Sequence, residues 1–217
     1  NLKNSIRKYR GMEKLRTAVF ISGRGSNLQN LIKSCGKKSF PARICLIISN
    51  NPNAKGLVYG KRAKIPVKII SQKNHKIQKN FEKEINNELL EHKIEFICLA
   101  GFMRMLSNYF INKWPSKVIN IHPSLLPSFK GLNAQKQAIQ EGVKVTGCTV
   151  HFVNSKMDNG PIIIQATVPV FTNDNEETLS KRILSVEHKI YPEALRLVAK
   201  KEIKISRGRV FIQKKGN

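Results

Sequence analysis

The sequence has few cysteines and no long apolar run. Its four cysteines, Cys35, Cys45, Cys98 and Cys148, are far apart and match no zinc or redox spacing, so they are expected to be reduced thiols. No stretch approaches the roughly 20 apolar residues that a transmembrane helix requires, and the first residues do not form the apolar core of a signal peptide. These absences predict a soluble, cytoplasmic protein that contacts no membrane and contains no disulfide.

Acidic residues are also scarce. The chain has 14 of them against 39 lysines and arginines, which gives a net charge of +25. Such a charge would suit a protein that binds nucleic-acid phosphates, but the lysines are spread along the whole chain and no arginine-rich arm, zinc module or ribonucleoprotein motif concentrates them. We therefore interpret the charge as a solvated basic surface, which would also speed the encounter with anionic small molecules. A basic nucleic-acid-binding protein remains the remote alternative.

The length and the apolar content suit one large domain. The chain has 217 residues, 41% of them hydrophobic, which is enough to bury a core without disulfides or metals. Residues 1–14 are basic and lack a core pattern. We therefore expect a basic N-terminal extension over residues 1–14 and a single domain over residues 15–217.

In the first half of the chain, apolar β-branched runs alternate with segments of helical period. The predicted strands are 17–22, 44–49, 67–70, 96–100 and 118–121. A helix is predicted after each of the first three strands. This alternation indicates an α/β fold, with a Rossmann-like, mostly parallel twisted sheet and helices on both faces.

The pattern changes after residue 131. A short helix at 134–141 is followed by two strands, 144–153 and 161–170, which are long enough to pair as an antiparallel hairpin. A long amphipathic helix is then predicted to begin near Asp174, because residues 174–177 fit a capping box. A C-terminal hairpin and a long helix thus complete the predicted fold.

A glycine-containing turn, Ser22-Gly23-Arg24-Gly25-Ser26-Asn27, follows the first predicted strand and precedes a helix. Backbone amides and the helix dipole can bind a phosphate at such a position. The turn is not a dinucleotide fingerprint, because Leu28 stands where the third glycine would be. From these residues alone, a phosphate site and a tight turn with a capped helix are equally good interpretations.

A second candidate site lies at the end of the fifth predicted strand. Asn120 and His122 alternate along this strand, so both should project to the same side, into the cleft at its carboxyl edge. Ligands bind at that edge in open α/β sheets. An amide and an imidazole emerging together from apolar neighbours therefore indicate a site rather than packing.

Two further segments are ambiguous on their own. Asp158 precedes an Asn-Gly-Pro turn, which the turn statistics would explain as a hairpin connection. Residues 99–106 leave a buried strand through Gly101, so their backbone could line a flat heterocycle or simply connect a strand to a helix.

Taken together, several segments resemble the glycinamide ribonucleotide formyltransferase family in order and spacing over residues 17–198. The segments are SGRGSN, LAGFMRML, NIHPSLLP, TGCTVHFV, MDNGPIIIQ and VEHKIYP. The run NIHPSLLP with a downstream aspartate is shared by the wider folate formyltransferase superfamily. SGRGSN and VEHKIYP point to the narrower family.

The resemblance implies a catalytic trio of Asn120, His122 and Asp158, which acts without a metal in de novo purine biosynthesis. The formyl donor would be 10-formyltetrahydrofolate, and the acceptor would be the amine of glycinamide ribonucleotide. The N-terminal half would bind the ribonucleotide and the C-terminal half the folate. The implied acceptor-binding residues are Gly25, Ser26 and Asn27 at the phosphate and Glu187 at the sugar or glycinamide end. The implied folate-binding residues are Met103, Arg104, Met105, Leu106 and Asn120.

The chain departs from the family pattern at two places. Asn133-Ala134-Gln135 stands where many relatives have histidines, so any acid–base role of those histidines is absent or replaced here. Gln78 falls near a folate-contacting arginine of some relatives, so Lys76 or Lys79 is expected to contact the glutamate tail of the folate.

The nearest alternative is another enzyme that uses the same donor. Methionyl-transfer-RNA formyltransferase has an extra C-terminal domain and formyltetrahydrofolate hydrolase an extra N-terminal one, so the length favours the ribonucleotide enzyme. We expect small-molecule substrates only, no specific nucleic acid, and a monomer or weak homodimer.

Overall fold

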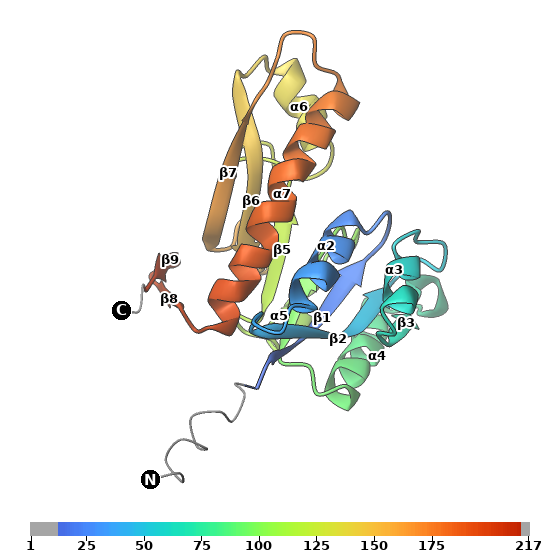
Figure 1. Ribbon diagram of the computed structural model, residues 1–217. Helices are drawn as coiled ribbons and strands as arrows, with labels where there is room; N and C mark the ends of the chain where they lie inside the picture. The colour runs from blue at the N-terminus through green and yellow to red at the C-terminus, as the bar shows by residue number, and fades with distance from the viewer. Residues whose placement is uncertain (1–12, 214–217) are drawn as a thin grey trace, which may run out of the picture.

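The computed structural model describes residues 13–213, and the predicted extension over residues 1–14 lies almost wholly outside them. A seven-stranded sheet with the order β3-β2-β1-β4-β5-β6-β7 forms the centre of the molecule (Figure 1). Strands β1 to β5 pair in parallel, and β6 and β7 extend the sheet in antiparallel fashion. The strands of the sheet are β1 (Leu15–Ile21), β2 (Ala42–Ser49), β3 (Val67–Ile69), β4 (Phe96–Leu99), β5 (Val118–His122), β6 (Val145–Phe152) and β7 (Ile162–Pro169).

Helices cover both faces of the sheet. They are α2 (Ser26–Cys35), α3 (Leu57–Arg62), α4 (Gln78–Glu91), α5 (Asn108–Ile111), α6 (Ala134–Gln140) and α7 (Glu176–Ala199), with one 3-10 turn, η2 (Gln72–Asn74). Within the described residues, none of these helices is long and apolar enough to cross a membrane. The predicted α/β fold, with its parallel sheet, C-terminal hairpin and long helix, is confirmed.

Alternation along β1 sends its side chains into two separate cores. Val19 and Ile21 pack with α2 and α7 on one face of the sheet. Ala18 and Phe20 pack with α4 and α5 on the other. Residues 18–21 of β1 are all apolar and are buried on both faces of the sheet, because successive side chains point to opposite sides.

The order of the strands reverses beside β1. The chain runs outward from β1 to β2 and β3 and then returns to β4 on the other side of β1. The segments that follow β1 and β4 therefore leave the carboxyl edge of the sheet side by side, and they line a shared crevice there. Residues 22–27 and 100–103 leave the sheet at this crevice, which is where the sequence placed its ligand segments.

The antiparallel half of the sheet is covered by α7, which runs along β6 and β7 from the α6 end of the molecule to the centre of the sheet (Figure 1). A third cluster, made of Ala138, Cys148, Val168, Leu179 and Ile183, joins α6, β6, β7 and α7. The β5-β6-β7 half thus has its own apolar support, which holds the site side chains of β5 and β6 on a rigid surface.

Some elements differ from the sequence prediction. Helix α5 and a second, two-stranded sheet of β8 (Ile203–Ser206) and β9 (Arg209–Ile212) were not predicted. Helix α5 and each of these two strands have only four residues, which is too few for a periodic pattern to reveal them.

The capping box of α7 lies one residue later than predicted. Asn175 caps the helix and exchanges hydrogen bonds with Thr178 (2.9 and 3.0 Å). Asp174 instead binds the guanidinium of Arg182 (2.7 and 2.8 Å), which holds the pKa of the Asp174 carboxyl below its usual range. The start of α7 is therefore fixed by both a cap and an ion pair.

Candidate active site

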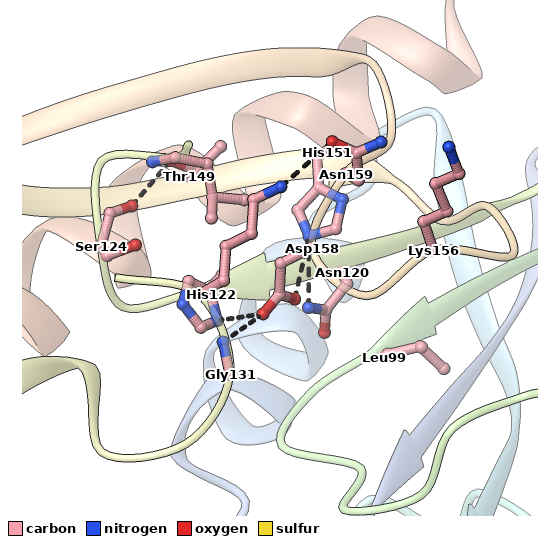
Figure 2. Close-up of polar contacts among 12 residues, drawn as sticks. Leu99, Asn120, His122, Ser124, Gly131, Thr149, His151, Lys156, Asp158 and Asn159 are labelled. Carbon is pink, nitrogen blue, oxygen red and sulfur yellow. Dashed lines mark hydrogen bonds and ion pairs between the residues drawn. The ribbon is translucent and has the colours of Figure 1, made fainter. Parts of the chain in front are cut away.

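The structure brings Asn120, His122 and Asp158 together at the carboxyl end of β5. Asp158 lies in the loop between β6 and β7, and its Oδ2 is 3.4 Å from His122 Nδ1. Figure 2 shows the Asp158 carboxylate between the side chains of His122 and Asn120. Three residues that are separated by up to 38 positions in sequence thus share one small polar cluster.

The His122 ring is more enclosed than the sequence suggested. It is only 6% exposed, because the loop of residues 123–131 and the Asp158 loop both fold over the strand end. His122 Nε2 lies 2.8 Å from the carbonyl oxygen of Phe129. Since a carbonyl only accepts, Nε2 carries a hydrogen, and Nδ1, which faces Asp158, is the nitrogen left for proton transfer.

The loop of residues 123–131 is held by buried polar contacts. Thr149 on β6 donates from Oγ1 to the Ser124 carbonyl (2.7 Å) and accepts from the Leu126 amide (3.1 Å). Gln165 on β7 donates to Thr149 Oγ1 (3.0 Å) and to the Leu126 carbonyl (2.9 Å). The same loop supplies the Phe129 carbonyl to His122, so the antiparallel strands fix the orientation of the imidazole.

Asp158 is held in an unusual backbone conformation. Its φ is +47°, in the left-handed region that aspartate and asparagine tolerate better than most residues. Its Oδ2 also accepts a hydrogen bond from the Gly131 amide at 2.8 Å. Next to it, a Cβ on Gly160 would lie 1.6 Å from the Phe152 carbonyl oxygen, so only glycine fits there. The loop is thus built to present the carboxylate to His122.

Sequence reasoning missed His151, which lies on β6 directly opposite Asn120. Its Nδ1 is 2.9 Å from the Phe152 carbonyl, so Nδ1 carries the hydrogen and Nε2 is free to accept. Nε2 lies 3.4 Å from Asn120 Nδ2 and 3.9 Å from Asp158 Oδ1. Burial lowers the pKa of His151, only partly opposed by its contact with the Phe152 carbonyl and by the charge of Asp158. A neutral His151 therefore orients the Asn120 amide (Figure 2).

The signal for His151 was present in the segment TGCTVHFV, but it depends on pairing. Residues 149 and 151 share a face with Asn120 and His122 only because the register pairs 120 with 151 and 122 with 149. A shift of one residue would turn His151 to the opposite face.

The turn after β1 forms the second part of the site. Gly25 has φ +73° and precedes α2, whose first turn has no side-chain cap among the described residues. A Cβ on Gly25 would lie 2.6 Å from Gly56 Cα, so two glycines allow the loops to touch. A hollow of about 230 Å³ lies beside them, lined by residues 22–27, Ala100, Gly101 and Met103. The amides at the start of α2 can bind an anion there.

Asn27 and Glu187 form a buried polar pair beside this turn. Asn27 Nδ2 donates to Glu187 Oε2 at 2.7 Å, and Glu187 is only 7% exposed. Burial raises the pKa of the Glu187 carboxyl, and the bond from Asn27 opposes this shift. Among the described residues, the other Asn27 side-chain atom, Oδ1, has no hydrogen-bond partner. Such a pair can recognise hydroxyl and amine groups.

The predicted folate segment, Met103 to Leu106, joins β4 to α5 at the edge of the same hollow. The side chains of Met103 and Met105 are 67% and 53% exposed, and Arg104 is also exposed. Leu106 is buried in the core with α4 and α5, so its side chain does not face the crevice. The segment therefore offers backbone groups and two exposed methionines to a flat ligand.

The predicted positions thus gather along one carboxyl edge. The turn at residues 22–27 lies beside Glu187 and Met103 at the crevice, and Asn120, His122 and Asp158 follow at the end of β5. An anion site, an amide, an imidazole and a carboxylate in this order suit transfer of an acyl group to an amine of a phosphorylated acceptor.

Comparisons with known proteins agree with this geometry. Residues 15–195 match the family model described as formyl transferase. A phosphoribosylglycinamide formyltransferase of Haemophilus influenzae is 42% identical over 175 residues, which are 81% of this chain and 82% of that protein. A crystal structure of glycinamide ribonucleotide transformylase 1 from Symbiobacterium toebii superposes with a TM-score of 0.91 at 42% identity, covering 93% of this chain and 95% of that one.

The chain also matches one part of much longer proteins. The human trifunctional purine biosynthetic protein adenosine-3 is 52% identical over 187 residues, which are 86% of this chain but only 18% of that protein. With a family model that spans most of its described residues and a fold that superposes over 93% of its length, the chain belongs to the formyl transferase family.

Proposed function

We propose that the chain transfers the formyl group of 10-formyltetrahydrofolate to the amine of glycinamide ribonucleotide, a step of de novo purine biosynthesis. The observation that carries the proposal is the Asn120–His122–Asp158 cluster beside the phosphate-binding turn at residues 22–27. The names of the two relatives covered over most of their length support the choice of acceptor.

The reaction joins two simple steps. The acceptor amine attacks the formyl carbon, which gives a tetrahedral intermediate with a negatively charged oxygen. The bond from that carbon to the folate nitrogen then breaks, the amine nitrogen loses a proton and the folate nitrogen gains one. The protein must therefore stabilise an oxyanion and move one proton.

Asn120 is the donor to the oxyanion. Its Nδ2 carries two hydrogens, and one of them points to His151 Nε2 at 3.4 Å, so the other is free for the formyl oxygen. A donor fixed at a developing oxyanion is worth about 3–4 kcal/mol. His151 contributes by fixing which end of the amide faces the reaction.

His122 and Asp158 carry out the proton transfer. With Nε2 committed to the Phe129 carbonyl, Nδ1 can hold or release a proton on the side that faces Asp158. The Nδ1–Oδ2 distance of 3.4 Å exceeds a normal hydrogen bond, so a water or substrate atom can contact both groups. Positioned proton transfer of this kind contributes roughly 100- to 10,000-fold to rate.

The acceptor is proposed to bind at the β1 end of the crevice. The amides of Gly25, Ser26 and Asn27 at the start of α2 would contact the phosphate, and Glu187 would contact the sugar or the glycinamide group. The folate would lie along Met103 to Leu106, with the catalytic cluster between the two substrates.

The first experiment is the steady-state rate of tetrahydrofolate formation with glycinamide ribonucleotide, with and without EDTA. We expect turnover that the chelator does not change, since hydrogen-bond donors and one proton relay suffice for this chemistry. Loss of turnover with EDTA would refute a metal-independent reaction. Absence of turnover by a folded protein would refute glycinamide ribonucleotide as the acceptor.

The same assay without acceptor tests hydrolysis of the donor. A formyltetrahydrofolate deformylase from Pseudomonas syringae superposes with a TM-score of 0.87 at 25% identity. Donor consumption that does not depend on the amine would favour this reaction instead. Tight, steeply salt-dependent binding to duplex DNA would favour the remote nucleic-acid alternative.

We propose one domain over residues 15–217 that acts in the cytoplasm as a monomer or weak homodimer. Sedimentation at several protein concentrations tests the assembly state.

A further inference from the structure

The segment Met103 to Leu106 is tied to the phosphate-binding turn at its first residue. The Met103 amide donates to Ser22 Oγ at 2.8 Å. The Ser22 amide in turn donates to the Gly101 carbonyl at 3.0 Å. These two bonds fix where the segment starts relative to β1, but they leave its far end unconstrained.

The far end is held by two side chains of α4. Gln78 Nε2 donates to the Met105 carbonyl at 3.0 Å and to Glu82 Oε1 at 3.1 Å. Glu82 Oε1 accepts from the Ser107 amide at 2.6 Å, and its Oε2 accepts from the Ser107 hydroxyl. The carboxylate of Glu82 thus holds the residue that directly follows the segment.

Glu82 is unusual because it is a completely buried acid. It is 0% exposed, and the described residues include no ion pair to it. Burying a charged group is costly unless hydrogen bonds satisfy it, and an apolar side chain would fill the same space without that cost. The hydrogen-bond partners of Glu82 are Ser107 and Gln78, so its contacts all lie at the far end of this one segment.

Side-chain packing cannot replace these bonds. Met103 and Met105 are more than half exposed, and only Leu106 reaches the core. A segment with so little buried apolar surface takes its conformation from the hydrogen bonds at its ends. Its free backbone groups keep their directions only while Ser22 holds one end and Glu82 the other.

We propose that Glu82, supported by Gln78, is a positioning residue that sets the conformation of Met103 to Leu106 and thereby the affinity for the formyl donor. This inference rests on the proposed function, because it assigns the segment to the folate. Glu82 contacts no substrate and acts through Ser107 and the Met105 carbonyl.

The test compares Glu82→Leu with Glu82→Gln. Leucine fills the space but accepts no hydrogen bond, so the Ser107 amide loses its partner. We expect the KM for 10-formyltetrahydrofolate to rise at least fivefold, with kcat and the KM for the acceptor within twofold of the wild type. Glutamine keeps one accepting oxygen and should restore the donor KM to within twofold.

A matched control separates positioning from general damage. Ile85→Val removes a buried methyl group from the same helix and leaves the hydrogen bonds of Gln78 and Glu82 to the segment in place. It should lower the melting temperature and leave the donor KM unchanged. If Ile85→Val raises the donor KM as much as Glu82→Leu does, the effect belongs to the stability of α4 and the proposal is wrong.

Two measurements do not depend on turnover. Calorimetric binding of the 5,8-dideaza analogue of the donor should weaken at least fivefold in Glu82→Leu, and amide exchange at residues 103–107 should speed up. Gln78→Leu removes the hydrogen bonds to the Met105 carbonyl and to Glu82. It should also weaken analogue binding and speed up amide exchange. It serves as the test variant if Glu82→Leu fails to fold.

The outcomes for the two proposals are distinct. Analogue binding by the wild type without formylation of glycinamide ribonucleotide would overturn the acceptor alone. Unchanged analogue binding in the folded Glu82→Leu and Gln78→Leu proteins would overturn the positioning role alone. A wild-type protein that does not bind the analogue would overturn both.

Discussion

Replacing Asp158 by asparagine should remove most of the catalytic rate without changing the fold. Asparagine has the same shape and tolerates the left-handed conformation that Asp158 adopts at φ +47°. It can still accept the hydrogen bond from the Gly131 amide. The substitution therefore removes the negative charge and little else.

The magnitude follows from the distance between Asp158 Oδ2 and His122 Nδ1. Opposite unit charges 3.4 Å apart attract by about 5 kcal/mol at an effective dielectric constant of about 20. This attraction stabilises positive charge on the imidazole when it holds the transferred proton. A loss of most of it corresponds to a fall in kcat of roughly 100- to 1,000-fold.

The assay is single-turnover and steady-state formation of tetrahydrofolate at saturating substrates, with thermal unfolding measured on the same preparations. Lys156→Ala is the matched control, because Lys156 is an exposed residue of the same loop. It should keep kcat within twofold. A folded Asp158→Asn enzyme with kcat within threefold of the wild type would show that the carboxylate charge does not support the proton transfer.

Three further predictions concern the rest of the site. Burial lowers the folded-state pKa of His151 from 6.5, so the unfolded state takes up the proton first and the free energy of unfolding falls as the pH drops below about 6.5. Denaturant titrations should show a smaller fall in His151→Gln. An equal fall in both proteins would contradict the burial argument. Burial raises the pKa of Glu187, so its charge costs stability above its ordinary pKa of 4.5. Glu187→Gln should therefore melt at a higher temperature at pH 7, while its KM for the acceptor rises about tenfold or more. A lower melting temperature would count against this reasoning. Gly25→Ala should destabilise the protein by about 1–3 kcal/mol, because φ of Gly25 is +73° and the new Cβ would meet Gly56. It should also raise the KM for the acceptor more than the KM for the donor. Equal effects on both KM values would argue against a phosphate site at this turn.

Local patterns in the sequence were sufficient to predict the parallel half of the fold. The five parallel strands and helices α2, α3 and α4 follow from apolar runs that alternate with amphipathic segments, since each pattern is specific to one backbone period. Alternation along residues 118–122 likewise placed Asn120 and His122 on one face, because both belong to a single strand. The roles of these residues remain predictions that the experiments above test.

Other features depended on contacts between distant segments. The enclosure of His122 comes from the loop of residues 123–131, which Thr149 and Gln165 hold from two other strands. In the sequence, Glu82 looks like an ordinary polar residue of a helix. Only the tertiary structure buries it and brings it to Ser107. Neither contact leaves a periodic signal.

The sequence by itself determined most of the helices and strands, and the shared face of β5 from which Asn120 and His122 project, because backbone period and side-chain type are local properties. The tertiary structure alone decided the strand order that opens the crevice beside β1, and the β5–β6 register that sets His151 opposite Asn120. These depend on which apolar faces pack together across the whole chain, a choice that no single segment encodes.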